Sequence, residues 1–258
     1  MAAKQDHIAV FDSGVGGISV LRELMALMPQ EKYIYFGDSA NAPYGTRTTE
    51  EVRQLTFAAV QKLMEQPIKA LVVACNTATA AAINQLRETY KDLIIVGIEP
   101  ALKPAVNAFP EGHIGVMATP VTLREEKMAQ LLKKYPHPNC TLIPAPGLME
   151  LVEAGLADTP QMDAFLTPLL APFKGSLDGL VLGCTHYPFA AASIKRVLGE
   201  RTRLFDGGAG TARQTKRLLE QADLLHDGPG ELQLLNSLNN PQILEITKEL
   251  LYKEVQYG

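Results

Sequence analysis

Two cysteines each follow an apolar run and precede polar residues, in Leu71-Val-Val-Ala-Cys75-Asn76-Thr77 and Leu180-Val-Leu-Gly-Cys184-Thr185-His186. A thiol can take up or release a proton near neutral pH, because the pKa of free cysteine is about 8.5. Two thiols facing one cleft could therefore remove a proton from one side of a carbon atom and return a proton to the other side. For either cysteine alone, a buried apolar role is the commoner alternative, and the matched pair favours chemistry.

Polar neighbours of these thiols could support such a proton transfer. A proton beside a carboxylate is very weakly acidic, so preformed donors must stabilise the carbanion. His186, two positions after Cys184, could hold or relay the thiol proton. A helix beginning at each cysteine would favour the thiolate and lower the pKa of the thiol. The candidate donors are Ser13, Asn76, Thr77 and Thr185.

A glycine-rich segment, Asp12-Ser13-Gly14-Val15-Gly16-Gly17, follows the first apolar run. Its glycines would let backbone N–H groups approach an anion at a helix N-terminus. The spacing differs from the G-x-G-x-x-G pattern of dinucleotide-binding folds. Asp12 is either a carboxylate of the site or a simple helix cap, and the residues alone leave both readings open.

Three further residues have weaker signals. Tyr44 lies in a Pro/Gly turn of the polar loop from Gly37 to Gly45, which could close over a small polar ligand. Asp38 in the same loop is either a site residue or a turn former. Glu153 lies in Leu151-Val-Glu-Ala-Gly155, where spacing alone favours a solvated helix face.

Several other chemistries are excluded or disfavoured. No Arg follows Cys75 or Cys184 within seven residues, as a cysteine phosphatase would need. Walker A, His-Glu-x-x-His and Gly-x-Ser-x-Gly motifs are absent from the sequence. Pyridoxal phosphate chemistry is only disfavoured, because its lysine leaves no clear sequence pattern. Three cysteines without a Cys-x-x-Cys pair predict neither a disulfide framework nor a metal site, and we interpret Cys140 as structural.

The composition is that of a globular protein. The 258 residues are 47% hydrophobic and 20% charged, with a net charge of −4. A mildly acidic chain does not predict nucleic-acid or membrane binding, although a local basic patch is not excluded. The polar start and the short apolar runs predict neither a signal peptide nor a membrane span. We therefore expect a cytoplasmic protein.

Apolar runs alternate with helical patterns along the chain, which predicts α/β units with mainly parallel sheets. Thr48 and Glu51 form a capping box pattern, and Thr119-Pro120 reads as a helix start. The predicted strands are Ile8–Phe11, Tyr33–Phe36, Ala70–Ala74, Leu93–Ile98, Ile114–Ala118, Thr141–Ile143, Leu180–Leu182 and Arg203–Phe205.

A weak internal repeat indicates two similar lobes. The segment starting at Ile8 resembles the one at Ile114, and the segment starting at Leu71 resembles the one at Leu180. Ligands of open α/β sheets bind beyond the carboxyl ends of the strands. Two lobes related by a pseudo-two-fold axis would bring Cys75 and Cys184 to one cleft from opposite sides.

The motifs together resemble those of the glutamate racemases, in the cofactor-independent aspartate/glutamate racemase superfamily. The resemblance runs from about Ile8 to Asp206. It implies interconversion of L- and D-glutamate without a cofactor or metal, supplying D-glutamate for peptidoglycan. The matching motifs are Asp12-Ser13-Gly14-Val15-Gly16-Gly17, Pro43-Tyr44-Gly45, Ala74-Cys75-Asn76-Thr77 and Gly183-Cys184-Thr185-His186-Tyr187-Pro188.

The resemblance also implies roles for individual residues. Cys184 would deprotonate L-glutamate with help from His186, and Cys75 would deprotonate D-glutamate with help from Asp12. Glu153 matches the family's Leu-Val-Glu-x-Gly segment and becomes an auxiliary catalytic candidate. Asp38 matches an acidic position of unclear role. The implied substrate contacts are Asp12, Ser13, Pro43, Tyr44, Gly45, Asn76, Thr77, Thr119, Thr185 and His186.

The family's architecture implies two pseudo-symmetric three-layer α/β lobes with the active site between them. The first would comprise residues 1–98 plus 208–258, completed by C-terminal helices, and the second residues 99–207. We expect a homodimer acting on a small molecule. The chain departs from the family at Asp206-Gly207-Gly208, where Asp-Ser-Gly is usual. It also lacks the N-terminal extension of members activated by a cell-wall precursor, so we expect no such activation.

Two alternatives remain open. An aspartate or hydantoin racemase would share the thiol motifs, although Pro43-Tyr44-Gly45 and Thr185-His186-Tyr187-Pro188 favour glutamate. A non-catalytic two-lobed receptor for a small acid would explain the cleft. Binding alone gives no reason for paired reactive thiols.

Overall fold

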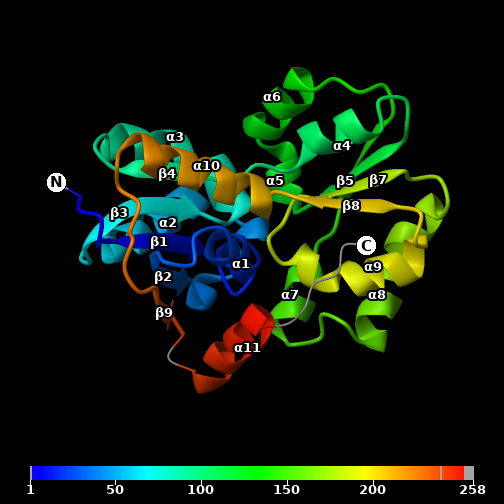
Figure 1. Ribbon diagram of the computed structural model, residues 1–258. Helices are drawn as coiled ribbons and strands as arrows, with labels where there is room; N and C mark the ends of the chain where they lie inside the picture. The colour runs from blue at the N-terminus through cyan, green and yellow to red at the C-terminus, as the bar shows by residue number, and fades with distance from the viewer. Residues whose placement is uncertain (1, 239, 253–258) are drawn as a thin grey trace.

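The computed structural model describes residues 2–238 and 240–252. These residues form two sheets of parallel strands that lie side by side, and helices flank each sheet (Figure 1). The first sheet has the strand order β4-β3-β1-β2-β9 and the second β6-β5-β7-β8. We call each sheet with its helices the first and the second lobe. The first-sheet strands are β1 (His7–Asp12), β2 (Lys32–Gly37), β3 (Ile68–Val73), β4 (Ile94–Gly97) and β9 (Glu231–Asn236). The second-sheet strands are β5 (Ile114–Ala118), β6 (Cys140–Pro144), β7 (Gly179–Leu182) and β8 (Arg203–Asp206).

The predicted α/β class is confirmed, and the internal repeat is visible in the strand pairing. β1 lies between β2 and β3 as β5 lies between β6 and β7, and β4 and β8 occupy matching outer positions. All eight predicted strands are present. The strand β9 was not predicted: the C-terminal segment contributes a strand as well as helices. The predicted lobe boundaries stay a prediction, and residues 1, 239 and 253–258 of the predicted first lobe lie outside the described part.

The helices begin where local sequence favours it. Thr48 accepts a hydrogen bond from the Glu51 backbone N–H, and the Glu51 side chain accepts one from Thr48, which is the predicted capping box. First-lobe helices are α1 (Ile18–Leu27), α2 (Thr49–Leu63), α3 (Asn76–Thr89), α10 (Gly208–Gln221) and α11 (Pro241–Tyr252). Second-lobe helices are α4 (Leu102–Ala108), α5 (Pro120–Arg124), α6 (Glu126–Lys134), α7 (Leu148–Glu153), α8 (Pro160–Leu170) and α9 (Ala191–Leu198). Short 3-10 helices are η1 (Ser39–Asn41), η2 (Tyr44–Thr46), η3 (Ala171–Phe173) and η4 (Tyr187–Ala190).

Strand alternation places apolar side chains on both faces of the first sheet. Ile8 and Val10 of β1 pack with residues of α1 and α10, whereas Ala9 and Phe11 pack with residues of α2 and α3. A sheet covered on both faces needs continuous apolar strands. That requirement explains why these strands were readily predicted.

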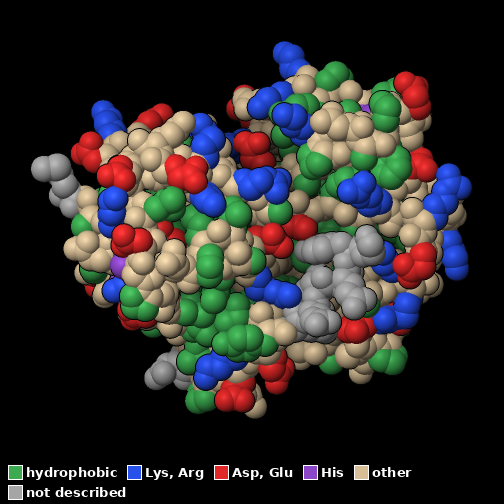
Figure 2. All heavy atoms as spheres, viewed as in Figure 1, with side chains coloured by type: hydrophobic (Ala, Val, Ile, Leu, Met, Phe, Trp, Pro, Cys, Tyr) green, Lys and Arg blue, Asp and Glu red, His purple; other side chains and the backbone are tan. Residues whose placement is uncertain are grey.

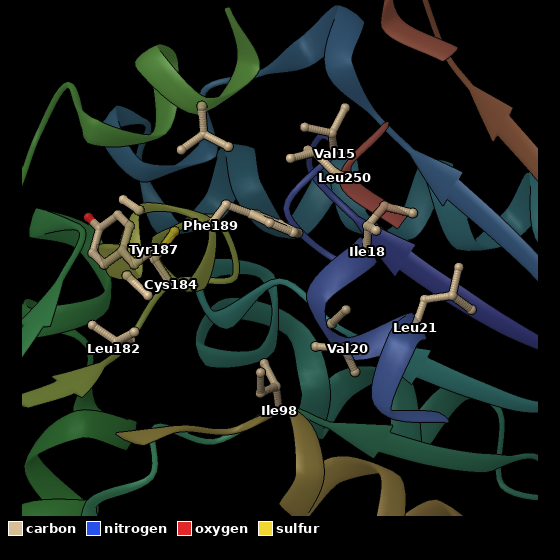
Figure 3. Packing of buried hydrophobic residues seen from close by; sticks show 14 of the residues in the cluster. Val15, Ile18, Val20, Leu21, Ile98, Leu182, Cys184, Tyr187, Phe189 and Leu250 are labelled. Atoms are coloured by element: carbon tan, nitrogen blue, oxygen red, sulfur yellow. The ribbon is translucent and has the colours of Figure 1, made fainter. Parts of the chain in front are cut away.

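One apolar cluster continues from the first lobe into the second. It includes Val15 of the loop before α1 and Ile18 at the start of α1, together with Phe189 of η4 and Leu250 of α11. Figure 3 shows Phe189 reaching from the second lobe toward the elements that carry Val15 and Ile18. Cys184 belongs to the same cluster, so the packing that joins the lobes also surrounds one of the two predicted thiols.

None of the helices described for residues 2–238 and 240–252 is sufficiently long and apolar to span a bilayer.

Candidate active site

The two motif cysteines lie just beyond equivalent central strands, Cys75 after β3 and Cys184 after β7. Both are buried, with 5% and 8% of their surfaces exposed. Cys75 caps α3, where its Sγ accepts a hydrogen bond from the Ala78 backbone N–H at 3.4 Å. Cys184 precedes the 3-10 helix η4 instead, so the predicted α-helix start is present only at Cys75.

The surroundings of Cys75 favour the neutral thiol. Ser13 Oγ lies 3.4 Å from its Sγ. Burial raises the pKa of Cys75 to about 12, with the Asp12 carboxylate and Cys184 adding to the rise. The predicted lowering of this pKa by a helix N-terminus is therefore wrong, because burial and a nearby negative charge outweigh it.

Cys184 instead heads a chain of hydrogen-bonding groups. Its Sγ lies 3.7 Å from His186 Nδ1, and His186 Nε2 lies 2.7 Å from Glu153 Oε1. The same carboxylate oxygen accepts the Val15 backbone N–H at 2.7 Å. A carboxylate beside one ring nitrogen orients the imidazole toward the thiol at the other. Glu153 thus contacts His186 rather than lying on the solvated face that spacing alone favoured.

The surroundings of His186 favour its protonated form. Its side chain is buried, and burial by itself lowers the pKa of an imidazole. Hydrogen bonds and charge from Cys184 and Glu153 act in the opposite direction, and the net pKa lies well above the usual value. A protonated imidazole can donate to sulfur and to carboxylate at once, which suits a partner that stabilises a thiolate.

The glycine-rich loop lets the two lobes approach closely. A Cβ on Gly14 would lie 1.9 Å from Glu153 Oε1, and one on Gly16 would lie 2.3 Å from His186 Nδ1. The loop does bind an anion through a backbone N–H, since Val15 contacts Glu153. That anion is a side chain of the second lobe.

Asp12 connects the two thiol motifs. It is fully buried; its Oδ1 accepts the Gly14 N–H at 3.0 Å and its Oδ2 accepts the Thr185 hydroxyl at 2.9 Å. Burial raises the pKa of Asp12 to about 6, although His186 and the hydrogen bonds from Thr185 and Gly14 act to lower it. The carboxylate therefore does more than cap a helix, because it links the first lobe to Thr185 of the second.

The polar loop after β2 folds onto itself. The Tyr44 hydroxyl donates to Asp38 Oδ2 at 2.7 Å, and Asn41 Nδ2 lies 3.0 Å from both Asp38 oxygens. Pro43 precedes η2, and Gly45 packs so near Thr119 that a Cβ would lie 2.9 Å from its side chain. Asp38 thus fixes the shape of a loop that faces the second lobe.

Hydroxyl groups from both lobes meet beside Asn76. Thr77 Oγ1 lies 3.2 Å from Thr119 Oγ1 and 3.2 Å from Thr122 Oγ1. Asn76 is buried, and its side-chain amide has no hydrogen-bond partner among the described residues. Sequence reasoning missed Thr122, for which the only signal is its place three residues after the helix cap Thr119.

A cavity of about 960 Å³ lies elsewhere, between β4, α4, β8 and α10, and none of the predicted site residues lines it. Its lining includes Arg87, Arg203 and Arg213 together with Glu99 and Asp206. Figure 2 shows basic and acidic side chains together where the lobes meet on this side. Asn76 and Thr122 instead line a smaller cavity of about 170 Å³.

Cys140 begins β6 and is only partly buried, away from the grouped residues of the two motifs. Within residues 2–238 and 240–252, no three His, Cys, Asp or Glu side chains are grouped so as to hold a metal ion.

Comparison with known proteins agrees with this arrangement. The family model described as Asp/Glu/Hydantoin racemase matches residues 18–215. The glutamate racemase of Clostridium novyi (strain NT) is 49% identical, covering 95% of this chain and 96% of its own. Crystal structures of glutamate racemases align with TM-scores of 0.87 for Bacillus anthracis (32% identical, 98% and 96% covered) and 0.84 for Escherichia coli with L-glutamate and an activator (33% identical, 95% of each chain covered). The chain therefore belongs to the Asp/Glu/hydantoin racemase family.

Proposed function

We propose that this chain is a glutamate racemase that moves the α-proton of glutamate between two cysteine thiols. The glutamate racemases among its relatives support the substrate, and the E. coli relative binds L-glutamate. The observation that carries the mechanism is the contrast between two buried thiols at equivalent strand ends. Cys184 contacts an imidazole whose pKa is raised, whereas burial and Asp12 raise the pKa of Cys75.

In the L-to-D direction, the Cys184 thiolate removes the α-proton and becomes a thiol. The Cys75 thiol donates its proton to the opposite face of the same carbon and becomes a thiolate. The imidazolium of His186 stabilises the Cys184 thiolate before the transfer, and Glu153 orients that ring. The reverse direction exchanges the roles, and Asp12 assists Cys75.

Residues around the two thiols bind the substrate, and the hydrogen-bond donors among them stabilise the carbanion. Asn76 has a buried amide without a partner among the described residues, so its hydrogen-bonding capacity is open to a ligand. The other proposed contacts are Asp12, Ser13, Pro43, Tyr44, Gly45, Thr77, Thr119, Thr185 and His186. Preformed donors of this kind can stabilise a developing negative charge without a cofactor.

We also propose a cytoplasmic homodimer that supplies D-glutamate for peptidoglycan. Light scattering on the eluted peak of a size-exclusion column measures the mass and tests the dimer. Depletion of the protein in its source cells, followed by rescue with D-glutamate in the medium, tests the pathway role.

Proton NMR and circular dichroism on L-glutamate in D2O test the reaction directly. Both the α-proton signal and the optical activity should disappear, without added pyridoxal phosphate. Cys75→Ala and Cys184→Ala should each abolish racemisation, while Cys140→Ala keeps it as the matched control. Full activity in either of the first two variants contradicts the two-thiol mechanism.

Parallel assays with L-aspartate and a substituted hydantoin decide among the racemase alternatives. Alkylation decides between enzyme and receptor: in a two-thiol enzyme Cys184, which contacts His186, should react faster than Cys140, and glutamate should protect it. Uniform reactivity without protection would favour structural cysteines.

A further inference from the structure

Three threonine hydroxyls form a buried ring where the lobes meet beside Cys75. Thr77 comes from α3 of the first lobe, and Thr119 and Thr122 come from the start of α5 in the second. Their Oγ1 atoms are separated by 3.2, 3.2 and 2.9 Å. The residues are 4%, 8% and 3% exposed, so water has little access to the hydroxyls.

The three hydroxyls differ in the acceptor that is available for the hydrogen of each. Each hydroxyl has one hydrogen to donate and two lone pairs to accept. Thr119 donates to Thr122 and also accepts the Thr122 backbone N–H at 3.2 Å as the helix cap. Thr122 then has Thr77 as the acceptor for its own hydrogen. The hydrogen of Thr77 points either back to Thr119 or outward to a ligand.

We infer that Thr122 is a positioning residue that frees the Thr77 hydroxyl to donate to the substrate. This inference rests on the proposed function, in which Thr77 and Thr119 contact glutamate. When Thr77 turns toward a carboxylate, the sequence of donors becomes Thr119 to Thr122 to Thr77 to substrate. Every buried hydrogen keeps an acceptor, and each hydroxyl polarises the next one.

The ring of hydroxyls also connects the two lobes on the Cys75 side of the site. Thr77 follows Cys75 by two residues on the same helix turn, so its contacts with Thr119 and Thr122 connect the Cys75 side of the site to the second lobe. Asn76, whose amide has no partner among the described residues, and Thr122 line the same small cavity.

Kinetics of Thr122→Val test the inference, because valine keeps the shape and removes the hydroxyl. KM for glutamate should rise about five- to tenfold, since a buried hydroxyl loses a partner, with kcat within twofold of wild type. Enantiomers have equal free energies, so kcat/KM must fall equally in both directions. Thr122→Ser should restore KM, because it keeps the oxygen and its hydrogen.

Thr56→Val is the matched control: Thr56 is a fully buried threonine of α2 whose hydroxyl donates to the Val52 carbonyl. It should keep the wild-type KM. A wild-type KM in Thr122→Val, or equal impairment in Thr122→Ser, overturns the inference while the proposed function stands. Wild-type protein that fails to racemise glutamate overturns both. If thermal unfolding shows that the valine variant is not folded, Thr122→Ala decides on the same criteria.

Discussion

The two thiol motifs occupy the same place in two repeated sheets yet have opposite surroundings. Two residues after Cys75 stands Thr77, and two residues after Cys184 stands His186. The hydroxyl faces other hydroxyls, whereas the imidazole contacts both sulfur and a carboxylate. The repeated architecture thus places a thiol at the same point of each sheet, and the side chain two residues after it gives each thiol a different environment.

Removing the imidazole should break this contrast most strongly. His186→Asn deprives Cys184 of its imidazole partner, and kcat/KM should fall roughly 10²- to 10⁴-fold, the usual range for a lost acid–base group. Steady-state racemisation in both directions measures the loss. A variant within threefold of wild type would show that Cys184 does not depend on the ring.

Displacing the imidazole without removing it should have a smaller effect. In Gly16→Ala the new Cβ would lie 2.3 Å from His186 Nδ1, and moving a catalytic group by about 1 Å can cost about 10²-fold. Gly210→Ala is the control, because apart from the backbone of its own helix no described atom outside its neighbours lies within 4 Å of the new Cβ. It should keep full activity and gain about 0.5–1 kcal/mol of helix stability. Equal activity in both variants would contradict a tightly fitted ring.

Neutralising Glu153 should change the pH dependence of activity that the Cys184 side of the site confers. The Glu153 carboxylate helps to raise the pKa of His186, so Glu153→Gln lowers that pKa and leaves less imidazolium as pH rises. We expect about a tenfold loss of kcat/KM near neutrality, equivalent to about one pKa unit of interaction. The pH–rate profile should show its alkaline limb at lower pH than wild type. An unshifted limb would mean that Glu153 only holds the Val15 loop.

Asp12→Asn tests the buried carboxyl near Cys75 through the pH dependence of the free energy of unfolding. The pKa of Asp12 is about 6 in the folded chain against 3.8 in the unfolded chain, so between these values the folded state binds more protons. Wild-type stability from this group therefore falls as pH rises from about 4 to 6. Asparagine does not titrate, so its free energy of unfolding relative to wild type should increase over that range by about 1–3 kcal/mol. Urea unfolding at pH 4.5 and 7.5 measures it; a pH-independent difference would contradict the buried charge.

Most of the fold could be predicted because central strands such as β1, β3, β5 and β7 are buried on both faces and therefore read as apolar runs. β9 could not, since Glu231–Asn236 forms an edge strand with half-buried side chains. Its pairing with β2 joins residues about 200 positions apart, such as Tyr35 and Leu234. Pairing with a strand so distant in the sequence depends on tertiary structure, and the local sequence pattern does not show it.

The site residues also fall into those that local sequence predicts and those that depend on tertiary contacts. The two cysteines and His186 could be predicted because their residue types and short spacing already suggest proton transfer. Glu153 reaches His186 across 33 positions, and only the family resemblance pointed to it. The pKa of Cys75 was predicted in the wrong direction, because burial and Asp12 come from the assembled lobes rather than from the helix that follows.

The position of β9 has a consequence for how the chain folds during synthesis. The whole second sheet is inserted between β4 and β9, so a chain leaving the ribosome completes β1 to β4 long before their last neighbour exists. Until Asn236 has been made, β2 is an open edge with unpaired backbone groups, the kind of surface that promotes aggregation. A chain cut before Glu231 would carry every residue assigned to the chemistry and still leave that edge uncovered.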